Sequence, residues 1–508
     1  MDKGGINMVA EHGLQHNATD SFRLPREYVK KYQVVPLGIE DGQLVIAIPR
    51  GLSFDIKQEL KVFFNQQLKF ERYESEELDK LVEEFLESGE ETIKGMLETI
   101  NSDEYSDDDI YFSQSVENLE DLAQEAPIVR LVNLMISEAL KERASDIHLE
   151  PFENEVKLRY RIDGILYERT PPPKNLFPAI ITRIKIMANQ DIAERRLPQD
   201  GRIRIRIAGK EVDIRVSTVP TIYGESLVMR LLDQSSVLLD LEQLGFEPDT
   251  LAKLDQNLNF INGIILVTGP TGSGKTTTLY SSLNKMNTPQ KKILTIEDPV
   301  EYHLDGINQM QANEKIGFGF ANGMRSILRQ DPDIIMVGEM RDLETAKMGI
   351  QAALTGHLVF STLHTNDSAS TIARLIDMGV EDYLVASTLR CVLAQRLVRR
   401  ICPNCKEVYK PDLAELRASG LPLDTDITFY QGQGCEECNN SGYRGRLAIL
   451  ELMDITPQIE DMITQKNNAN EIKKIARQQG MRTLREDGLK KVERGLTTLE
   501  EVLRVTQV

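Results

Sequence analysis

The 508-residue chain is long enough for about three domains, and its 41% apolar and 27% charged residues are ordinary for a soluble protein. No stretch approaches 18 consecutive apolar residues and the N-terminus lacks the apolar core of a secretory signal, so we expect neither a transmembrane helix nor export, and the cytoplasm is the expected compartment. The net charge of −19 argues against a broadly basic surface of the kind that nucleic-acid binding favours.

Residues 1–88 predict a small N-terminal α/β domain. Apolar and polar residues alternate on both sides of Asp41-Gly42, a pair typical of a tight hairpin turn. Helical spacing then begins at Ser53, which suits a helix N-cap. Residues 71–125 hold 20 acidic and 3 basic residues, a net charge of −17, so nearly all the excess acidity lies there. With few apolar residues, 89–125 predicts an acidic flexible linker, either a solvated spacer or a charged docking site.

Residues 126–238 predict a second domain of α+β type. An amphipathic helix follows Ala126-Pro127, and the alternating segments after it suit an antiparallel or mixed sheet interrupted by a helix around residues 177–191. From about residue 246 short apolar strands alternate with helices, which predicts a parallel sheet covered on both faces. These strands are expected at 264–268, 292–296, 333–337 and 358–363. The chain as a whole is therefore expected to be a multidomain α/β protein.

Residues 269–276 read GPTGSGKT, which satisfies the phosphate-binding loop pattern GxxxxGK[ST] between an apolar strand and a helix. Backbone amides of such a loop curl around phosphate oxygens, Lys275 supplies charge to the β- and γ-phosphates, and the Thr276 hydroxyl can ligate Mg²⁺. NKMN at 284–287 lacks the Asp of a guanine-reading NKxD, so ATP is the expected nucleotide. The expected nucleotide-binding residues are Gly269, Pro270, Thr271, Gly272, Ser273, Gly274, Lys275, Thr276 and Thr277.

Three side chains at strand ends are candidate catalytic groups, since parallel sheets bind ligands at the carboxyl ends of their strands. Glu339 follows its strand with Gly338 where an Asp is usual, and it could polarise the attacking water and assist Mg²⁺ through a water shell, or be an exposed acid without a role. Glu297, beside Asp298, could complete the Mg²⁺ and water shell, although a structural turn also explains the spacing. His364 could sense the γ-phosphate, with a structural histidine as the alternative.

The sequence holds five cysteines, four of which form two CxxC pairs: Cys402 with Cys405, and Cys435 with Cys438. In a cytosolic chain, such pairs can close a tetrahedral thiolate site for structural Zn²⁺, and reduced core thiols are the alternative. Cys391 lies in the apolar stretch VASTLRCVLAQRL, which we predict to be a helix, and it is expected to be a buried packing residue.

The segments SDIHLEP, RLPQDGR, GPTGSGKTTTLY, TIEDPVEY, LRQDPDIIMVGEMRD and GHLVFSTLHTND, with the paired CxxC, together resemble the secretion ATPase superfamily from about residue 120 to the C-terminus. The nearest resemblance is to the type II secretion ATPases, and the alternative is the type IV pilus assembly (extension) ATPases. The resemblance implies a RecA-like ATPase domain over residues 239–508, with a zinc-binding tetracysteine module at 391–447. It also implies that the second domain is PAS-like.

The same resemblance implies a site that arginines complete. Arg215 and Arg230 match family arginines of the second domain that approach the phosphates, although salt bridging along a sheet would also explain them. Residues 238–246 resemble the family's adenine-contacting stretch. The catalytic side is matched by Arg325, Arg329 and Arg341.

Partners and location are also implied by the resemblance. We expect a homohexamer, peripherally attached to the cytoplasmic face of the bacterial inner membrane and without nucleic acid. The N-terminal domain would bind the cytoplasmic domain of an inner-membrane assembly protein, and a polytopic inner-membrane platform protein is a second expected partner. Hydrolysis of ATP to ADP and phosphate would power pseudopilus assembly and type II secretion, as in a translocase. A regulatory module that binds ATP without turnover and a DNA translocase are the alternatives from other classes.

Overall fold

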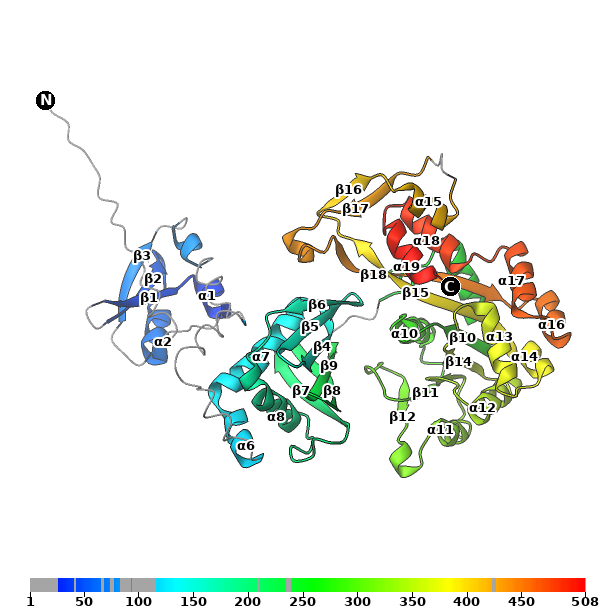
Figure 1. Cartoon of the computed structure of the whole chain (residues 1–508), viewed down its shortest axis with the longest axis horizontal. Coiled ribbons are helices and arrows are strands. Elements are labelled where there is room, and N and C mark those ends of the chain that lie inside the picture. The colour runs from blue at the N-terminus through cyan, green and yellow to red at the C-terminus, as the bar shows by residue number, and fades with distance from the viewer. Residues whose placement is uncertain are drawn as a thin grey trace. The chain divides into compact units, whose positions relative to one another are not determined.

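A computed structural model describes residues 26–40, 43–64, 68–73, 77–82, 93, 116–207, 210–233, 239–422 and 426–507 (Figure 1). The chain divides into two compact units, Met1–Ser113 with Val129–Met135 and Gln114–Ile128 with Ile136–Val508. Within the described ranges no helix has both the length and the apolar character that crossing a bilayer requires.

The first unit contains a three-stranded sheet in the order β1-β2-β3. β1 (Val35–Glu40) pairs antiparallel with β2 (Gln43–Pro49), which confirms the predicted hairpin, although its turn residues 41–42 lie outside the described residues. β2 runs parallel to β3 (Leu68–Tyr73). The helices are α1 (Arg26–Tyr32) and α2 (Phe54–Phe64), and their apolar residues join those of β2 in one core. This is the small α/β domain that the alternating pattern predicts.

The second domain is built on a six-stranded antiparallel sheet in the order β6-β5-β4-β9-β8-β7. Its strands are β4 (Ala144–Pro151), β5 (Val156–Ile162), β6 (Ile165–Arg169), β7 (Gln199–Ile207), β8 (Lys210–Thr221) and β9 (Gly224–Asp233). Helix α7 (Ala126–Lys141) precedes the sheet, and α8 (Phe177–Met187) separates β6 from β7. The antiparallel sheet, the leading helix and the interrupting helix are as predicted.

One helix lies where the sequence predicts linker. Residues 116–124 form α6 (Val116–Gln124), which packs against α8. Leu119 and Ala123 of α6 are buried, so this short apolar stripe gains its stability from tertiary packing. The predicted linker, 89–125, therefore extends too far at its C-terminal end, because two buried apolar residues carry little weight in an acidic window.

The largest sheet has seven strands in the order β12-β11-β13-β14-β10-β15-β18. Every neighbouring pair from β12 to β15 is parallel, and β18 closes the sheet antiparallel to β15. The strands are β10 (Gly263–Thr268), β11 (Ile293–Glu297), β12 (Asn308–Gln311), β13 (Ile334–Val337), β14 (Leu358–Leu363), β15 (Leu389–Ile401) and β18 (Tyr443–Asp454). All four predicted strands are present, and their parallel pairing is confirmed.

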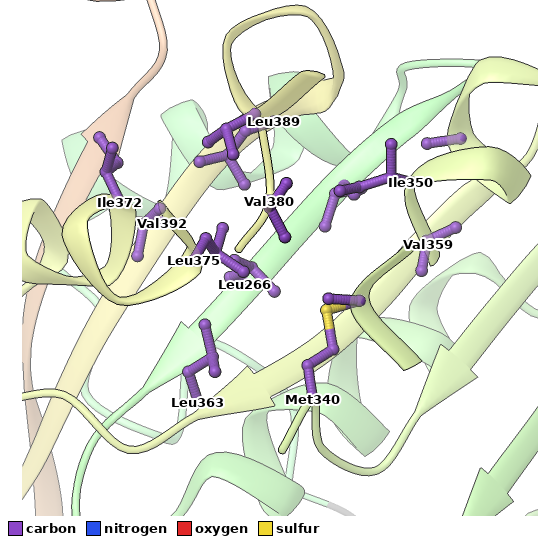
Figure 2. Packing of buried hydrophobic residues seen from close by; sticks show 14 of the residues in the cluster. Leu266, Met340, Ile350, Val359, Leu363, Ile372, Leu375, Val380, Leu389 and Val392 are labelled. Carbon is purple, nitrogen blue, oxygen red and sulfur yellow. The ribbon is translucent and has the colours of Figure 1, made fainter. Parts of the chain in front are cut away.

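Helices cover both faces of this sheet (Figure 1). One face carries α11 (Phe320–Ile327), α12 (Leu343–Leu354), α13 (Ser368–Asp377), α14 (Asp382–Thr388), α16 (Pro457–Thr464) and α17 (Ala469–Gln478). Figure 2 shows this core, where Leu266 of β10 and Val359 of β14 meet Ile350 and Leu375 from the helices. The other face carries α9 (Pro248–Leu258) and α10 (Lys275–Met286). Each large apolar side chain that is fully buried in these cores stabilises the fold by about 1.5–3 kcal/mol.

Between β15 and β18 the chain makes the tetracysteine excursion, with α15 (Leu413–Ser419) and an antiparallel pair of β16 (Lys406–Tyr409) and β17 (Phe429–Gly432). The helices α18 (Leu484–Glu493) and α19 (Leu499–Thr506) complete the chain. Cys391 is fully buried, as expected, but it lies in β15, so the predicted helix there is wrong. An unbroken apolar run fits either a helix or a strand, and this one is a strand because it pairs with β10 on one side and β18 on the other.

Candidate functional site

The phosphate-binding loop joins the end of β10 to the N-terminus of the twelve-residue helix α10. A Cβ on Gly269 would lie 2.5 Å from the Gln395 carbonyl oxygen and 2.6 Å from Ser273 Oγ, so the backbone can pass there only as glycine. Gly274, just before the helix, has φ 87°, which a side chain would strain. The Ser273 hydroxyl is buried and lacks a hydrogen-bond partner among the described residues. The loop is thus a narrow polar cradle with a helix N-terminus at its end, which fits a phosphate.

Lys275 lies inside this cradle. Its Nζ donates hydrogen bonds to the carbonyl oxygens of Gly269, at 2.8 Å, and Pro270, at 3.0 Å. Burial lowers the pKa of Lys275 to about 8; the charge of Glu339 opposes this shift and the charge of Arg396 adds to it. An anion bound in the loop would restore the stability of the ammonium.

This pKa gives a prediction for pH dependence. The Lys275 ammonium is charged below pH about 8 and neutral above it. We therefore expect kcat/KM for Mg-ATP to fall by about tenfold per unit above that pH, since kcat/KM reports groups of the free protein. kcat at saturating Mg-ATP should stay level to higher pH, because bound phosphates favour the charged form. Steady-state assays across this range check it, and parallel profiles for the two constants would contradict it.

Two residues that the sequence did not single out brace the loop from β15. Gln395 is buried, and its Oε1 accepts a 2.7 Å hydrogen bond from Thr278 Oγ1 of α10. Arg396 follows it, and its guanidinium donates to Asn366 and to the Gln395 carbonyl, at 3.1 Å each. A Cβ on Gly269 would lie 3.2 Å from that guanidinium. The sequence signal for these two residues was a polar pair within the apolar run CVLAQRL. Their connection to the loop depends on the pairing of β15 with β10, the strand that leads into the loop.

Glu339 lies just beyond the end of β13, beside the cradle. Its carboxylate forms an ion pair with Arg341, and its Oε2 lies 3.6 Å from His364 Nε2, beyond the end of β14. Burial lowers the pKa of His364, and the nearby charge of Lys275 adds to this shift, so both favour the neutral ring. The structure therefore brings together three predicted site residues, Lys275, Glu339 and His364.

Gly338, the residue before Glu339, connects the ends of β11 and β14 through its backbone. A Cβ on Gly338 would lie 3.4 Å from both the Glu297 Cα and the Phe320 ring. The Gly338 N–H donates to the Ile296 carbonyl at 2.8 Å, and its own carbonyl accepts from Thr362 Oγ1 at 2.7 Å. The two 3.4 Å separations are ordinary van der Waals distances, so the backbone around Gly338 does not by itself exclude a side chain there.

Glu297 is more deeply engaged than the sequence predicts. Its side chain is buried at the end of β11, and burial raises its pKa. One oxygen accepts hydrogen bonds from Thr295 Oγ1, at 2.5 Å, and Gln309 Nε2, at 3.2 Å, while the other accepts from the Tyr280 hydroxyl of α10. Both oxygens thus have protein partners. A role of Glu297 in the Mg²⁺ and water shell stays a prediction, and its neighbour Asp298 is the exposed member of the pair.

The arginines of the second domain lie opposite one another on β8 and β9. Arg230 Nε donates to Asp146 within its own sheet at 3.0 Å, the arrangement that plain salt bridging along a sheet would give. The Arg215 guanidinium instead reaches the domain of the seven-stranded sheet and the phosphate-binding loop, called the catalytic domain below. There it donates to Glu301 Oε2 at 2.7 Å and to the Val300 carbonyl at 3.4 Å. Arg215 therefore connects the second domain to the segment that follows β11.

The remaining residues implied by the resemblance lie around the same sheet. Arg325 of α11 pairs with Glu344, and Arg329 donates to the Arg325 carbonyl at 2.8 Å, so both are engaged away from Glu339. Residues 238–246 are the stretch expected to contact adenine, and in its described part, 239–246, the Leu239 carbonyl accepts a 2.6 Å hydrogen bond from Ser281 of α10. That stretch therefore contacts the helix that begins at the phosphate-binding loop.

The four paired cysteines converge on one point, and their sulfur atoms all lie within 4.8 Å of one another. The pairs Cys402–Cys435 and Cys405–Cys438 are each 3.8 Å apart, and Cys435–Cys438 are 3.7 Å apart. Four thiolates about 2.3 Å from one tetrahedral zinc ion stand about 3.8 Å from each other, so the cluster fits Zn²⁺. Four sulfurs leave no open coordination position, so such an ion would be structural.

Removal of one thiolate tests this cluster. In the full chain, Cys438→Ser is expected to reduce bound zinc from about one equivalent per chain to well below that, because the tetrahedral site needs all four sulfurs. It should also lower the unfolding temperature. Metal analysis and thermal unfolding measure the two effects. Cys391→Ala, which removes a buried thiol outside the cluster, is the matched control and should keep its zinc. Equal zinc contents in the two variants would contradict the assignment.

Comparison with known families gives two matches. Residues 121–504 match the family described as Type II/IV secretion system protein, and residues 7–92 match the MshEN domain. The first match covers the second domain, the phosphate-binding loop, Glu339 and all four paired cysteines.

Similar curated proteins cover almost the whole chain. Type II secretion system protein E of Xanthomonas campestris pv. campestris is 49% identical over 492 residues, covering 95% of this chain and 85% of that protein. Type II secretion system ATPase E of Vibrio cholerae is 42% identical, covering 96% of this chain and 97% of that protein. The type IV pilus assembly ATPase PilB of Myxococcus xanthus is 46% identical, covering 94% and 85%.

Solved structures agree on the fold. The pilus retraction motor PilT with bound ADP is 27% identical, with a TM-score of 0.51, covering 74% of this chain and 96% of that one. The ATPase DotB of Legionella pneumophila is 23% identical, with a TM-score of 0.54, covering 73% and 94%. The shared part has the predicted multidomain α/β architecture.

Proposed function

The chain belongs to the family of type II/IV secretion system proteins, and on that basis we propose that it is an ATP-hydrolysing motor of type II secretion. The observation that carries the proposal is the position of Glu339 and His364 at the carboxyl ends of β13 and β14, beside the Lys275 cradle. A loop that binds phosphate and a carboxylate that can polarise water stand at one edge of the sheet. That arrangement suits hydrolysis of ATP to ADP and phosphate.

In this proposal the loop residues 269–277 hold the phosphates through backbone N–H groups, and Lys275 neutralises charge on the β- and γ-phosphates. Thr276 would hold Mg²⁺, which when bound neutralises charge that develops on the phosphate oxygens. Glu339 orients the attacking water and accepts its proton. His364, whose neutral form is favoured by burial, can donate or accept a hydrogen bond beside the γ-phosphate.

Arg215 and Arg230 are proposed to complete the site from the second domain. The guanidinium is suited to this role because its planar fork binds phosphate with two parallel hydrogen bonds. Since these arginines belong to a domain separate from the loop, turnover would depend on how the two domains close around the nucleotide. Repeated closure and opening is the step that would convert hydrolysis into mechanical work.

The proposed working form is a homohexamer on the cytoplasmic face of the bacterial inner membrane. Its N-terminal domain would bind the cytoplasmic domain of an inner-membrane assembly protein, and the ring would act on a polytopic platform protein to assemble a pseudopilus. We expect ATP turnover per chain to rise when the protein is concentrated enough to form the hexamer, since closure is then stabilised by neighbours. Light scattering combined with phosphate release measures both quantities, and a turnover per chain that stays constant as the hexamer forms would contradict it.

A type IV pilus assembly ATPase is the second candidate, favoured by the 46% identity to PilB over nearly the whole chain. Complementation separates the two functions. In bacterial strains that lack either the type II secretion ATPase or the pilus assembly ATPase, the chain should restore secretion and not pilus extension. Restoration of pili alone would overturn the secretion assignment while leaving ATP hydrolysis in place.

A further inference from the structure

A row of charged residues crosses the sheet of the second domain at one level. Arg202 of β7 lies opposite Arg215 of β8, which lies opposite Arg230 of β9, which lies opposite Asp146 of β4. Residues directly opposite in antiparallel strands present their side chains on the same face. Arg215 is therefore flanked on both sides by arginines, and like charges at such positions are destabilising. A nearby anion would therefore stabilise the Arg215 guanidinium.

The two flanking arginines have carboxylates in their own domain. Arg202 Nε donates to both oxygens of Asp213, at 2.6 and 2.7 Å, and Arg230 pairs with Asp146 at 3.0 Å. Arg215 instead donates to Val300 and Glu301 of the catalytic domain, and Glu301 is the charged partner, at 2.7 Å. Arg161 of β5 lies opposite Asp146 at the same level, 3.7 Å from its carboxylate. Of these four arginines, Arg215 is the one whose charged partner lies across the domain boundary.

Glu301 is in turn fixed to the helix that begins at the phosphate-binding loop. Its backbone N–H donates to the Tyr280 hydroxyl of α10 at 3.3 Å. Tyr280 is fully buried, its hydroxyl donates to Glu297, and its ring meets the Tyr302 ring edge-on at 4.6 Å. The side chain of Glu301 is about one-third exposed, and that of Arg215 is one-quarter exposed. The backbone of Glu301 is therefore anchored, while its ion pair is open to exchange with another anion.

We infer that Glu301 is a positioning residue that competes with the phosphates of the bound nucleotide for the Arg215 guanidinium. This inference rests on the proposed function, in which Arg215 approaches the phosphates. Glu301 holds Arg215 against the catalytic domain at a point tied to α10, and phosphates in the loop draw the same guanidinium away. When the terminal phosphate leaves, Arg215 returns to the Glu301 carboxylate, so Glu301 sets the free-energy cost of moving this guanidinium to the phosphates.

The test is nucleotide affinity in the full chain, measured with a fluorescent non-hydrolysable ATP analogue. Glu301→Gln removes the competing charge while keeping the shape of the side chain, and we expect the analogue to bind about two- to fivefold more tightly, the range of a partly exposed ion pair. In an Arg215→Gln background the same substitution should not change the affinity for the analogue, because the guanidinium for which Glu301 and phosphate compete is absent. Glu168→Gln, which removes an exposed carboxylate paired with Lys157, is the matched control and should change nothing.

The outcomes separate this inference from the proposed function. If the wild-type chain binds the analogue but Glu301→Gln binds it equally or more weakly, or binds it more tightly in both backgrounds, competition is overturned and the ATPase proposal stands. A merely structural role of Glu301 would weaken binding in both backgrounds alike. If the wild-type chain does not bind the analogue, the proposed function fails and the competition fails with it.

Discussion

Replacement of Glu339 by Gln is expected to lower kcat for ATP hydrolysis by about 10²–10⁴-fold, the contribution of a well-placed general base. The amide keeps the shape of the side chain beside Arg341 and His364 but cannot accept a proton from the attacking water. Nucleotide affinity should change little, because the loop and Lys275 hold the phosphates. Phosphate release under saturating Mg-ATP and equilibrium binding of a fluorescent nucleotide measure the two quantities.

The matched control for this substitution is Glu344→Gln. Glu344 lies five residues further along the chain, in the first turn of α12, where its carboxylate pairs with the exposed Arg325. Its replacement should leave kcat within a few-fold of the wild type, since exposed ion pairs contribute about 0–1 kcal/mol. Equal rates for Glu339→Gln and the wild type would remove Glu339 from the chemical step.

Replacement of Arg215 by Gln should lower kcat by about 10³–10⁵-fold if its guanidinium stabilises the transferring phosphate as an arginine finger does. Arg202→Gln is a sharp control, because Arg202 lies directly opposite Arg215 in the same sheet and is neutralised by Asp213 within its own domain. Arg202→Gln should keep kcat within a few-fold of the wild type. Similar losses in both variants would mean that the sheet, rather than the reach of Arg215 toward the nucleotide, had been disturbed.

Arg230→Gln tests the other candidate arginine. Arg230 is held by Asp146 at 3.0 Å, so it must leave that carboxylate to meet a phosphate. A fall in kcat comparable with that of Arg215→Gln would place both arginines at the nucleotide. A loss of thermal stability with unchanged kcat would instead assign Arg230 to the sheet.

Much of the catalytic domain could be predicted because its local signals agree with its tertiary structure. The strands that became β10, β11, β13 and β14 are short, wholly buried apolar runs, and each is followed by the polar or glycine-rich residues of a strand end. The phosphate-binding loop has a fixed spacing, and the cysteine pairs are local motifs whose sulfurs then need only one chain reversal to meet.

Features that depend on neighbours distant in the sequence could not be predicted in the same way. The run around Cys391 fits helix or strand equally, and only pairing with β10 and β18 makes it β15. Gln395 supports the loop through Thr278, which lies 117 residues earlier in the chain. Glu297 ends its strand, where a catalytic acid could lie, yet hydrogen bonds from Tyr280 and Gln309 engage its carboxylate. The partner of Arg215 likewise belongs to another domain, so no local pattern points to Glu301.

Release of inorganic phosphate from Mg-ATP by the purified full-length chain tests the central claim most directly, with Lys275→Ala beside it at the same protein concentration. The account predicts turnover by the wild type and no release above background by the variant, because the loop then lacks the charge that holds the β- and γ-phosphates. A wild-type chain that binds ATP without releasing phosphate, or a Lys275→Ala chain that releases it at the wild-type rate, would contradict the account.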